Sequence, residues 1–463
     1  MSQPFDALII GAGQAGPPLA ARLTAAGMSV ALMERHRFGG TCVNTGCTPT
    51  KALVASAYAA HLARRAADYG VTIAGAIDVD MKQVMARAHA IAAHSRTAVE
   101  AWLRGMEGLT VFPGHARFED ANTLRVGDDL LTAPRIFINV GGRPRLPAMP
   151  GLQEIDALTN ASILAMDTLP RHLVIVGGSY IGLEFAQIYR RFGAAVTVVE
   201  KGPHLVARED EDVSTAIQQI LQDEGIDVRL NAECIAFAPH PDGVAVHVDG
   251  TDGASEVLGS HVLLAVGRRP NTDDLGLERA GVAMDAHGYI MVDDQLRTNV
   301  PGLWALGDCN GRGAFTHTSY NDFEIVAANL LDGAAQRVSD RIPGSALYID
   351  PPLGRVGMTE TQARATGRPL LMGTRAMTRV GRAIEKGETQ GLMKIVVDAE
   401  TQRILGAAIL GTGGDEAIHG LLDMMHADQP FTTLQWAVPI HPTVSELIPT
   451  VLGELQPLPL PAT

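Results

Sequence analysis

The stretch GTCVNTGCTPTK, residues 40–51, places two cysteines and a lysine at close, regular spacing. Four residues separate Cys42 from Cys47, and Lys51 is the fourth residue after the second cysteine. An oxidised pair at this spacing closes a small ring, and such a strained, accessible disulfide is the readily reducible kind. Taken alone, two such cysteines are more often buried structural residues, so the flanking sequence has to decide.

Pro49 indicates that a helix follows the second cysteine. Proline lacks an N–H group that the first helical turn does not need, and we expect this helix over residues 50–67. Cys47 would then lie at the helix N-terminus, where the macrodipole favours a thiolate. The position therefore favours a reactive second cysteine.

A dinucleotide-binding pattern precedes the cysteines. Residues 8–16, LIIGAGQAG, are an apolar strand that runs into G-x-G-x-x-G, with a helix expected over 18–26 and a strand over 29–33. The glycines are Gly11, Gly13 and Gly16. They permit a tight turn and the close approach of backbone N–H groups to a pyrophosphate. Glu34 follows at the distance expected of an acid that binds an adenosine ribose.

The same pattern occurs a second time in residues 173–182, LVIVGGSYIG, ahead of an expected helix over 183–192 and a strand over 195–199 that ends in Glu200. The fingerprint positions are Gly177, Ser179 and Gly182. Ser179 replaces the middle glycine, which leaves less room for a phosphate but offers a hydroxyl that can donate to it. The alternative is a Rossmann unit that has lost its nucleotide.

Composition excludes several classes of function. A chain of 463 residues is too long for one core, and its net charge of −14 supplies no basic stripe for nucleic acid. Four cysteines rule out a disulfide scaffold and fit a reducing cytoplasm. Neither a signal peptide nor an apolar run of membrane-spanning length is evident, so we expect no membrane partner.

Beyond residue 348 the sequence changes character. Expected strands over 392–397 and 404–410 alternate with expected helices over 415–427 and 443–453, which indicates a separate α+β domain. We expect an α/β fold with two Rossmann-like dinucleotide-binding domains and a C-terminal α+β domain. The predicted boundaries are 1–150 with 271–345, 151–270, and 346–463. The apolar residues at 80–104 recur with helical spacing and predict a helix that packs against the rest of the protein and has no chemical role.

Three motifs together resemble the FAD-dependent pyridine nucleotide–disulfide oxidoreductases, which include dihydrolipoamide dehydrogenase, glutathione reductase and mercuric reductase. They are residues 40–51, residues 298–308 ending in Asp308, and HPTVSE at 441–446. The resemblance covers nearly the whole chain and follows the family's domain order, with the C-terminal domain as the dimerisation domain.

The resemblance implies the residues that would bind two cofactors, FAD and NADH or NADPH. Gly11, Gly13, Gly16 and Glu34 would hold the ADP half of FAD, and Asp308 would bind its ribityl chain. The remaining FAD-site residues would be Gly40, Thr41, Lys51 and Gly141. The nicotinamide nucleotide would contact Gly177, Ser179, Gly182, Glu200 and Gly267. No metal-ligand spacing is evident.

The resemblance also implies catalytic roles. Cys47 would be the thiolate that faces the flavin and forms a charge-transfer complex with it, and Cys42 would be the thiol that attacks the substrate. Lys51 would lie by the flavin and pair with Glu184, because a buried lysine needs a partner. His441, oriented by Glu446, would act as acid and base on the cysteines of the other subunit of a homodimer. Without the other motifs, His441 would read as a surface histidine.

The choice of substrate stays open. Thr48 after the second cysteine and DPPLGRVG at 350–357 look most like mercuric reductase-like members, yet the chain shows no Cys-x-x-Cys module and no C-terminal cysteine pair. His441 supplies the proton transfer that disulfide reduction needs, so we favour a small disulfide as substrate. The alternatives are a mercuric or other metal ion reductase, an NAD(P)H oxidase, and a redox-sensing flavoprotein.

Nucleotide choice and substrate contacts are weaker predictions. Glu200 would repel a 2′-phosphate and favour NADH, although Lys201, His204 and Arg208 could accommodate NADPH. Specificity would come from the cleft around Cys42, with Tyr58, Arg64 and Arg65 as candidates that could equally be a solvated face. His317, Cys234 and Cys309 read as structural residues, although His317 could approach the flavin.

Overall fold

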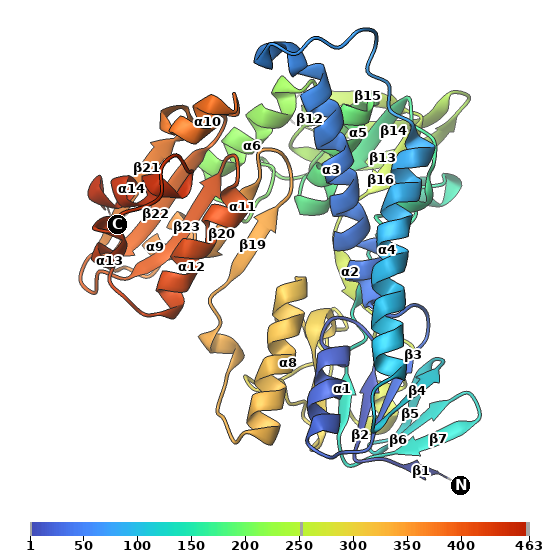
Figure 1. The fold of residues 1–463 in the computed structure, drawn as a ribbon. Helices are drawn as coiled ribbons and strands as arrows, with labels where there is room; N and C mark the ends of the chain where they lie inside the picture. Colours follow the sequence, from blue (N-terminus) through green and yellow to red (C-terminus); the bar gives the residue numbers. More distant parts are fainter. Residues whose placement is uncertain (1, 251–252, 460–463) are drawn as a thin grey trace.

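The computed structural model describes residues 2–250 and 253–459. In the described residues the strands form six sheets, which belong to three units of the fold (Figure 1). The first is a parallel sheet of five strands in the order β18, β8, β2, β3, β4. Their bounds are Leu303–Ala305, Ile136–Ile138, Ala7–Ile10, Val30–Glu34 and Leu109–Pro113. Strand β2 is apolar and wholly buried, as a parallel strand covered on both faces must be.

Helices α1 (Gly16–Ala25) and α8 (Thr316–Leu331) lie side by side on this sheet (Figure 1). Because β18 and α8 come from beyond residue 300, the chain returns to this unit after building the second. A small sheet in the order β1, β7, β6, β5 extends the unit, with bounds Gln3–Pro4, Asp129–Thr132, Thr123–Val126 and Ala116–Asp120. Strand β1 pairs parallel with β7, and the other pairs are antiparallel.

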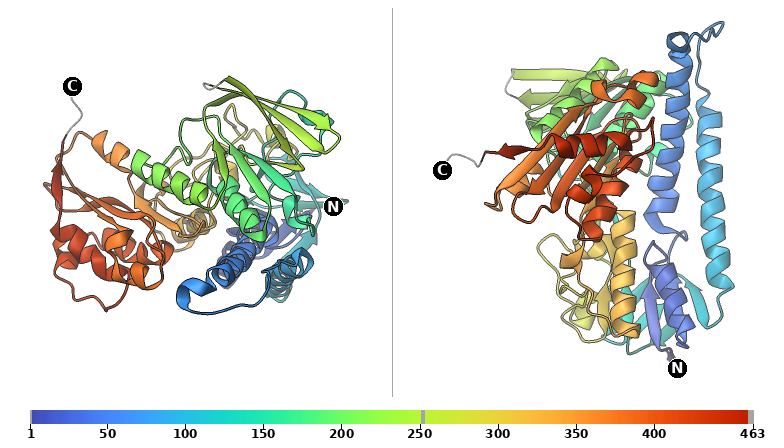
Figure 2. Two further views of the ribbon diagram at one scale, coloured as in Figure 1. Left: turned by 90° about the horizontal axis from the view of Figure 1, so that it is seen from above. Right: turned by 60° about the vertical axis from the view of Figure 1, so that its left-hand side comes forward.

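The cysteine stretch forms helix α2 (Gly40–Thr45) and the start of helix α3 (Cys47–Arg64). Helix α3 packs along helix α4 (Met81–Arg104) over most of its length (Figures 1 and 2). The prediction of residues 50–67 for α3 was wrong at both ends. The helix starts at Cys47 because the backbone of Gly46 is not helical, and after Arg64 it tightens into the 3₁₀ turn Ala66–Tyr69.

The second unit is a parallel sheet in the order β12, β11, β10, β16, with bounds Asp227–Arg229, Ala195–Val199, His172–Val176 and His261–Leu264. Helices α5 (Tyr180–Phe192) and α6 (Glu211–Asp223) belong to it. Helix α5 begins three residues before the predicted start at 183. An antiparallel sheet of β13, β14 and β15 follows, with bounds Ala232–His240, Gly243–Gly250 and Gly253–Gly259.

Two short connecting strands run between the units. Strand β9 (Gly142–Pro144) leads into the second unit and β17 (Arg268–Pro270) leads out of it, and the two pair antiparallel. The two chain segments that connect the units therefore lie side by side, just after the carboxyl ends of β8 and β16. Short helical turns follow at Leu152–Glu154, Ile163–Ala165, Leu277–Ala280 and Gly307–Asn310.

The C-terminal unit, orange to red in Figure 2, is built on a sheet. Its six strands lie in the order β19, β20, β23, β22, β21, β24. The bounds are Gly344–Leu347, Leu353–Gly357, Ile404–Leu410, Leu392–Asp398, Leu370–Ala376 and Gln456–Leu458. Its helices are Glu360–Arg364, Gly381–Glu385, Gly414–Ala417, His419–His426, Thr432–Gln435 and Ile448–Gly453.

Two predictions for this unit need correction. The single helix predicted over 415–427 is two, α11 (Gly414–Ala417) on β20 and α12 (His419–His426) mainly on β23. The helix predicted from residue 443 becomes regular only at Ile448, after the 3₁₀ turn Ser445–Leu447. Near the C-terminus, strand β24 pairs with β21, and residues 460–463 lie outside the described part.

The observed sheets fit the α/β class with a C-terminal α+β unit, while the residue limits of the three domains stay a prediction. Throughout residues 2–250 and 253–459, no helix combines the length and hydrophobicity needed to cross a membrane.

Candidate active site

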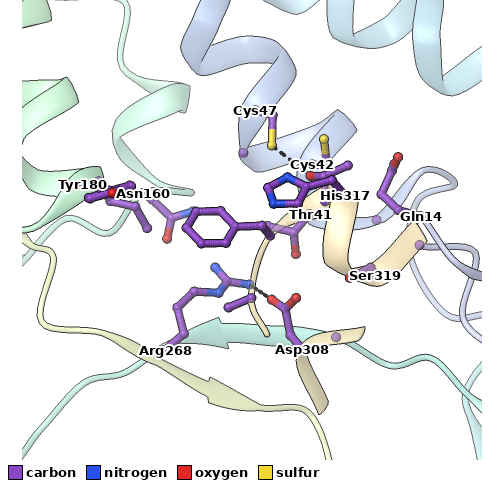
Figure 3. Close-up of a pocket in the computed structure, with 18 of the residues that line it drawn as sticks. Gln14, Thr41, Cys42, Cys47, Asn160, Tyr180, Arg268, Asp308, His317 and Ser319 are labelled. Carbon is purple, nitrogen blue, oxygen red and sulfur yellow. Dashed lines mark hydrogen bonds and ion pairs between the residues drawn. The ribbon is translucent and has the colours of Figure 1, made fainter. Parts of the chain in front are cut away.

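The main cavity has a volume of about 1700 Å³ and is lined by all three units. Ordinary small-molecule pockets measure about 300–1,000 Å³, so this one has room for a large cofactor and a second ligand. Cys42, Cys47 and His317 lie at one side of it, with Arg268 and Asp308 opposite (Figure 3). Predicted site residues on its wall are Gly11, Gly13, Glu34, Gly40, Thr41, Cys42, Cys47, Lys51, Gly141, Ser179, Glu184, Gly267 and Asp308.

The first glycine turn is built for close backbone approach. Gly11 has φ of 102°, and a Cβ there would lie 2.3 Å from the carbonyl oxygen of Asn139. Gly16 is not on the cavity wall, and a Cβ there would lie 2.3 Å from the carbonyl oxygen of Gly11. Its role is therefore to let helix α1 pack on strand β2. The Glu34 carboxylate accepts hydrogen bonds from the N–H groups of Ala12 (2.9 Å) and His36 (2.8 Å).

Several features of the wall fit FAD. Gly141 and Gly267 have positive φ, 64° and 106°, and open space where a Cβ would stand, so side chains there would narrow the cavity. The Oδ1 atom of Asn44 is buried and has no hydrogen-bond partner among residues 2–250 and 253–459. Burial raises the pKa of Asp308, although the Arg268 guanidinium 3.5 Å away opposes this. Buried polar groups such as Asn44 and Asp308 on the cavity wall suit a ligand rich in hydroxyl and amide groups, which can satisfy their hydrogen bonds.

The two cysteines are free thiols, with Cys42 half-buried on α2 and Cys47 at the first position of α3. The hydrogen bond from Cys42 is the largest cause that lowers the pKa of Cys47, to about 6. The Thr316 hydroxyl and the Lys51 ammonium act in the same direction, against the effect of burial. The same hydrogen bond and burial raise the pKa of Cys42. These opposite shifts favour Cys47 as the thiolate of the pair and Cys42 as the thiol.

Thr316 is a site residue that sequence reasoning missed. Its Oγ1 atom lies 3.2 Å from the Sγ atom of Cys47, and it is the first residue of α8. The contact joins residues 269 positions apart, and no local motif marks it. Only the three-dimensional fold brings this hydroxyl to the thiolate.

Lys51 and Glu184 form the expected ion pair. The Nζ atom of Lys51 lies 2.8 and 2.7 Å from the two carboxylate oxygens of Glu184, which is buried on α5. Tyr348, a second residue missed from the sequence, places its ring centroid 4.5 Å from the same Nζ atom. The pair lies on the cavity wall near Cys47.

His441 lies outside this cavity. Its Nδ1 atom is 3.0 Å from the Glu446 carboxylate, while 81% of its side chain is exposed. Large apolar side chains around it are also exposed, Trp436, Val438 and Ile440. The structure thus keeps the histidine and the glutamate together but does not bring them to the cysteines of the same chain.

A second cavity of about 1120 Å³ lies at the second glycine turn, with Gly177, Ser179, Glu200 and Gly267 on its wall. Glu200 accepts hydrogen bonds from the N–H groups of Gly178 (2.6 Å) and Gly202 (2.7 Å). Gly182 is not on the wall of this cavity. A Cβ at Gly182 would lie 2.1 Å from the carbonyl oxygen of Gly177, so the glycine lets helix α5 pack closely on the turn. Gly16 and Gly182 thus have the same packing role in the two units.

The remaining candidates occupy varied positions. His317 lies on the main cavity wall, stacks on Phe315 at 5.3 Å, and its Nε2 atom donates to the carbonyl oxygen of Gly344 at 2.8 Å. Cys309 is fully buried. Cys234 lies within strand β13.

The helix α3 candidates hold neighbouring elements rather than lining the cavity. Tyr58 donates to Glu388 at 2.6 Å, Arg64 to the carbonyl oxygen of Arg191, and Arg65 to that of Gly387. Over the described ranges 2–250 and 253–459, no three His, Cys, Asp or Glu residues are grouped to hold a metal ion.

Comparison with known proteins agrees with this architecture. Residues 5–322 match the model of the pyridine nucleotide-disulphide oxidoreductases, and residues 343–452 match the dimerisation domain of the same family. The probable pyridine nucleotide-disulfide oxidoreductase RclA of Escherichia coli is 36% identical over 96% of this chain and 97% of its own. Mercuric reductase of Streptomyces lividans is 33% identical over 89% of this chain and 88% of its own.

Two further relatives extend the comparison. Dihydrolipoyl dehydrogenase of Rhizobium etli is 31% identical over 96% of this chain and 97% of its own. A solved structure, the Cu(II) complex of the HOCl-induced flavoprotein disulfide reductase RclA from Escherichia coli, matches with a TM-score of 0.88 at 33% identity, covering 98% and 99% of the two chains. This chain therefore belongs to the pyridine nucleotide–disulfide oxidoreductase family and is an enzyme that uses FAD and NAD(P)H.

Proposed function

We propose that this enzyme passes electrons from NAD(P)H through FAD to the Cys42–Cys47 disulfide and then to a small disulfide substrate. The observation that carries the proposal is the geometry of the two cysteines. Both lie on the cavity wall, and the Sγ atom of Cys47, the first residue of α3, lies 3.2 Å from the Oγ1 atom of Thr316. The pKa of Cys47 is lowered to about 6 by the hydrogen bond from Cys42, with help from Thr316 and Lys51. One sulfur is thus held as a thiolate on the cavity wall, and the other keeps its proton until substrate arrives.

Residues on the cavity wall that include Gly11, Gly13 and Asp308 would hold FAD, which would supply two-electron transfer from the nicotinamide to the disulfide. Those electrons break the Cys42–Cys47 bond and leave two sulfurs that carry one proton between them. Cys42, as thiolate, attacks one substrate sulfur and expels the other as a thiolate, which takes a proton. Cys47 then attacks the Cys42 sulfur of the mixed disulfide, restores the Cys42–Cys47 bond and expels the second substrate sulfur as a thiolate, which takes a proton from solvent. In sum, NAD(P)H, a proton and one disulfide give NAD(P)⁺ and two thiols.

His441 would provide the proton transfers from the partner subunit of a homodimer. Its exposure, its contact with Glu446 at 3.0 Å, and the neighbouring apolar side chains support this assignment. A neutral imidazole can take the Cys42 proton and return it to the leaving thiolate. On this proposal each active site combines the cysteines of one subunit with the histidine of the other.

The nicotinamide nucleotide is proposed to be NADH. Glu200 ends β11 beside the second glycine turn, and its carboxylate is fixed by the N–H groups of Gly178 and Gly202. A fixed carboxylate accepts from a ribose 2′-hydroxyl and repels a 2′-phosphate. We expect the enzyme to work in a reducing compartment, the cytoplasm, as its low cysteine count first indicated.

A metal ion is the second candidate acceptor. Similarity to mercuric reductase, and to a reductase solved as a Cu(II) complex, supports it, and a thiolate pair is the ligand type that soft metal ions prefer. Two electrons would reduce one Hg(II) to Hg(0) or two Cu(II) to Cu(I). The intact His441–Glu446 pair, which this chemistry does not use, favours the disulfide.

The test is the initial rate of NADH and NADPH oxidation by the FAD-loaded enzyme with lipoamide, glutathione disulfide, Hg(II), Cu(II) or oxygen alone. Cys42→Ser is the critical variant, and Cys309→Ala is the matched control because Cys309 lies outside the cavity. We expect disulfide-dependent turnover that Cys42→Ser abolishes and Cys309→Ala retains. Turnover with metal ions only, or with oxygen at an undiminished rate in Cys42→Ser, would replace the proposal with the corresponding alternative.

A further inference from the structure

Three distant parts of the chain each contribute one residue to a single contact group on the cavity wall. Lys51 comes from α3, Glu184 from α5, and Tyr348 directly follows β19 of the C-terminal unit. We propose that Tyr348 is a positioning residue that fixes the Lys51 ammonium beside Cys47 and the flavin site. The inference rests on the proposed function, in which the Lys51 charge helps to stabilise the Cys47 thiolate.

The Glu184 carboxylate alone does not fix the direction of the Lys51 ammonium. Both carboxylate oxygens contact Nζ, at 2.8 and 2.7 Å, but an ammonium on a flexible four-carbon stem can pivot about such a pair. The Tyr348 ring, whose centroid lies 4.5 Å from Nζ, attracts the cation to its negative face. This second attraction restricts the pivot, and it is stronger in a partly desolvated cavity than at an exposed surface.

Tyr348 also holds the other member of the ion pair. Its backbone N–H donates to Oε1 of Glu184 at 3.1 Å, so one residue contacts both the carboxylate and the ammonium. Within the described ranges 2–250 and 253–459, the hydroxyl of Tyr348 makes no hydrogen bond to the protein. The ring and the backbone, and not the hydroxyl, therefore carry the positioning.

The position of Lys51 matters for the neighbouring sulfur. After the Cys42 and Thr316 hydrogen bonds, the Lys51 charge is a further cause that lowers the pKa of Cys47. An ammonium that moves away from its place stabilises the thiolate less, because Coulomb attraction falls with distance. The ring of Tyr348 thus acts on Cys47 through Lys51, across the junction between the C-terminal unit and the other two.

The test compares Tyr348→Leu and Tyr348→Phe in the FAD-loaded protein. Tyr348→Met is a second ring-free variant in case the leucine protein does not bind FAD. Tyr69→Leu is the matched control, since the Tyr69 ring lies 5.7 Å from the Arg65 guanidinium but outside the cavity. Two quantities are measured after anaerobic reduction by NADH: the pH midpoint of the long-wavelength thiolate-to-flavin absorbance, and the rate at which that absorbance forms.

We expect Tyr348→Leu and Tyr348→Met to move the pH midpoint upward and to slow formation about tenfold. Tyr348→Phe and Tyr69→Leu should match the wild type in both quantities. A ring-free variant with the wild-type midpoint and rate, or a phenylalanine variant as impaired as leucine, would overturn the inference. Neither measurement uses an electron acceptor, so a wrong substrate assignment would show in the turnover assay and not here.

Discussion

The Sγ atom of Cys47 lies 3.2 Å from the Oγ1 atom of Thr316, which places the first residue of α8 against the proposed thiolate. The contact joins the cysteine stretch to a helix that enters the fold only after the second Rossmann unit is complete. Because the hydroxyl stabilises negative charge on the sulfur, it is one cause of the lowered pKa of Cys47.

Thr316→Val should therefore raise the pKa of Cys47 above its value of about 6, because the variant loses the hydrogen bond from the Thr316 hydroxyl and keeps the one from Cys42. In the reduced FAD-loaded enzyme, the thiolate-to-flavin absorbance disappears as the pH falls through that pKa, and in the variant it should disappear at a higher pH. Thr316→Ser retains a hydroxyl and should stay close to the wild type. A valine variant that titrates with the wild type would show that Thr316 does not stabilise the thiolate.

Mixed dimers test whether His441 serves the partner subunit. Cys42→Ser and His441→Gln homodimers should each be inactive toward disulfides. When the two are unfolded and refolded together, a hybrid dimer regains one intact site, so the mixture should recover about a quarter of wild-type activity. Refolded wild type is the reference, and each variant refolded alone is the control. Recovery no greater than in those controls would place the histidine and the cysteines in the same subunit, or show that His441 has no catalytic role.

The nucleotide preference depends on Glu200. Glu200→Arg removes the carboxylate held by Gly178 and Gly202 and adds a cation that suits a 2′-phosphate. The ratio of kcat/KM for NADH to that for NADPH should fall by about tenfold or more, the effect of about 1.4 kcal/mol. Arg208→Glu, on the main cavity wall, is a charge-changing comparison. An unchanged ratio in Glu200→Arg would remove Glu200 from nucleotide selection.

Stability should depend on Lys394, whose side chain is only 2% exposed. Its Nζ atom lies 2.7 Å from Asp212, 2.8 Å from Glu360 and 3.7 Å from Asp210, which joins the second unit to the C-terminal unit. Lys394→Met leaves these carboxylates facing one another and should cost about 3 kcal/mol of unfolding free energy. Arg297→Met, which removes an exposed pair with Asp293, should cost under about 0.5 kcal/mol. Calorimetric Tm values that do not separate the two variants would contradict this.

The pH dependence of this cluster has a definite sign. Burial opposes ionisation of Asp210, but the N–H groups of Glu360 and Thr361 and the Lys394 charge outweigh it, so its pKa lies below the usual value. A carboxyl with a lowered pKa stabilises the fold above its unfolded pKa, near 4, and loses that contribution as the pH falls through its folded pKa. The Tm difference between wild type and Lys394→Met should therefore be full at neutral pH and shrink below about pH 4.

The sequence predicted those parts of the site that depend on local spacing. The glycine turns, the two cysteines and Lys51 are each recognisable within a dozen residues. The structure places the first glycine turn, the cysteines and Lys51 on the main cavity and the second glycine turn on the second cavity. Glu184 came from family resemblance and is found beside Lys51 at 2.7 Å. The separation of His441 from the cysteines of its own chain also agrees with an active site shared by two subunits, which stays a proposal.

Thr316 and Tyr348 could not be predicted because their contacts span hundreds of residues and depend on how the units meet. Tyr348 follows an edge strand, and nothing in its neighbours marks it as a partner of Lys51. The sequence also failed to predict the ends of helices that are set by the backbone conformation of a single residue. The non-helical Gly46 starts α3 at Cys47, whereas the sequence favoured a start near Pro49.

The most direct test of the central claim counts thiols before and after anaerobic reduction with NADH, in unfolded protein that contains four cysteines. If Cys42 and Cys47 form the disulfide that receives electrons from the flavin, the air-oxidised enzyme should show about two reactive thiols and the NADH-reduced enzyme about four. Cys42→Ser should gain none on reduction, and omission of NADH should leave the wild-type count unchanged. A wild-type count that NADH does not change, while the flavin itself is bleached, would contradict the account.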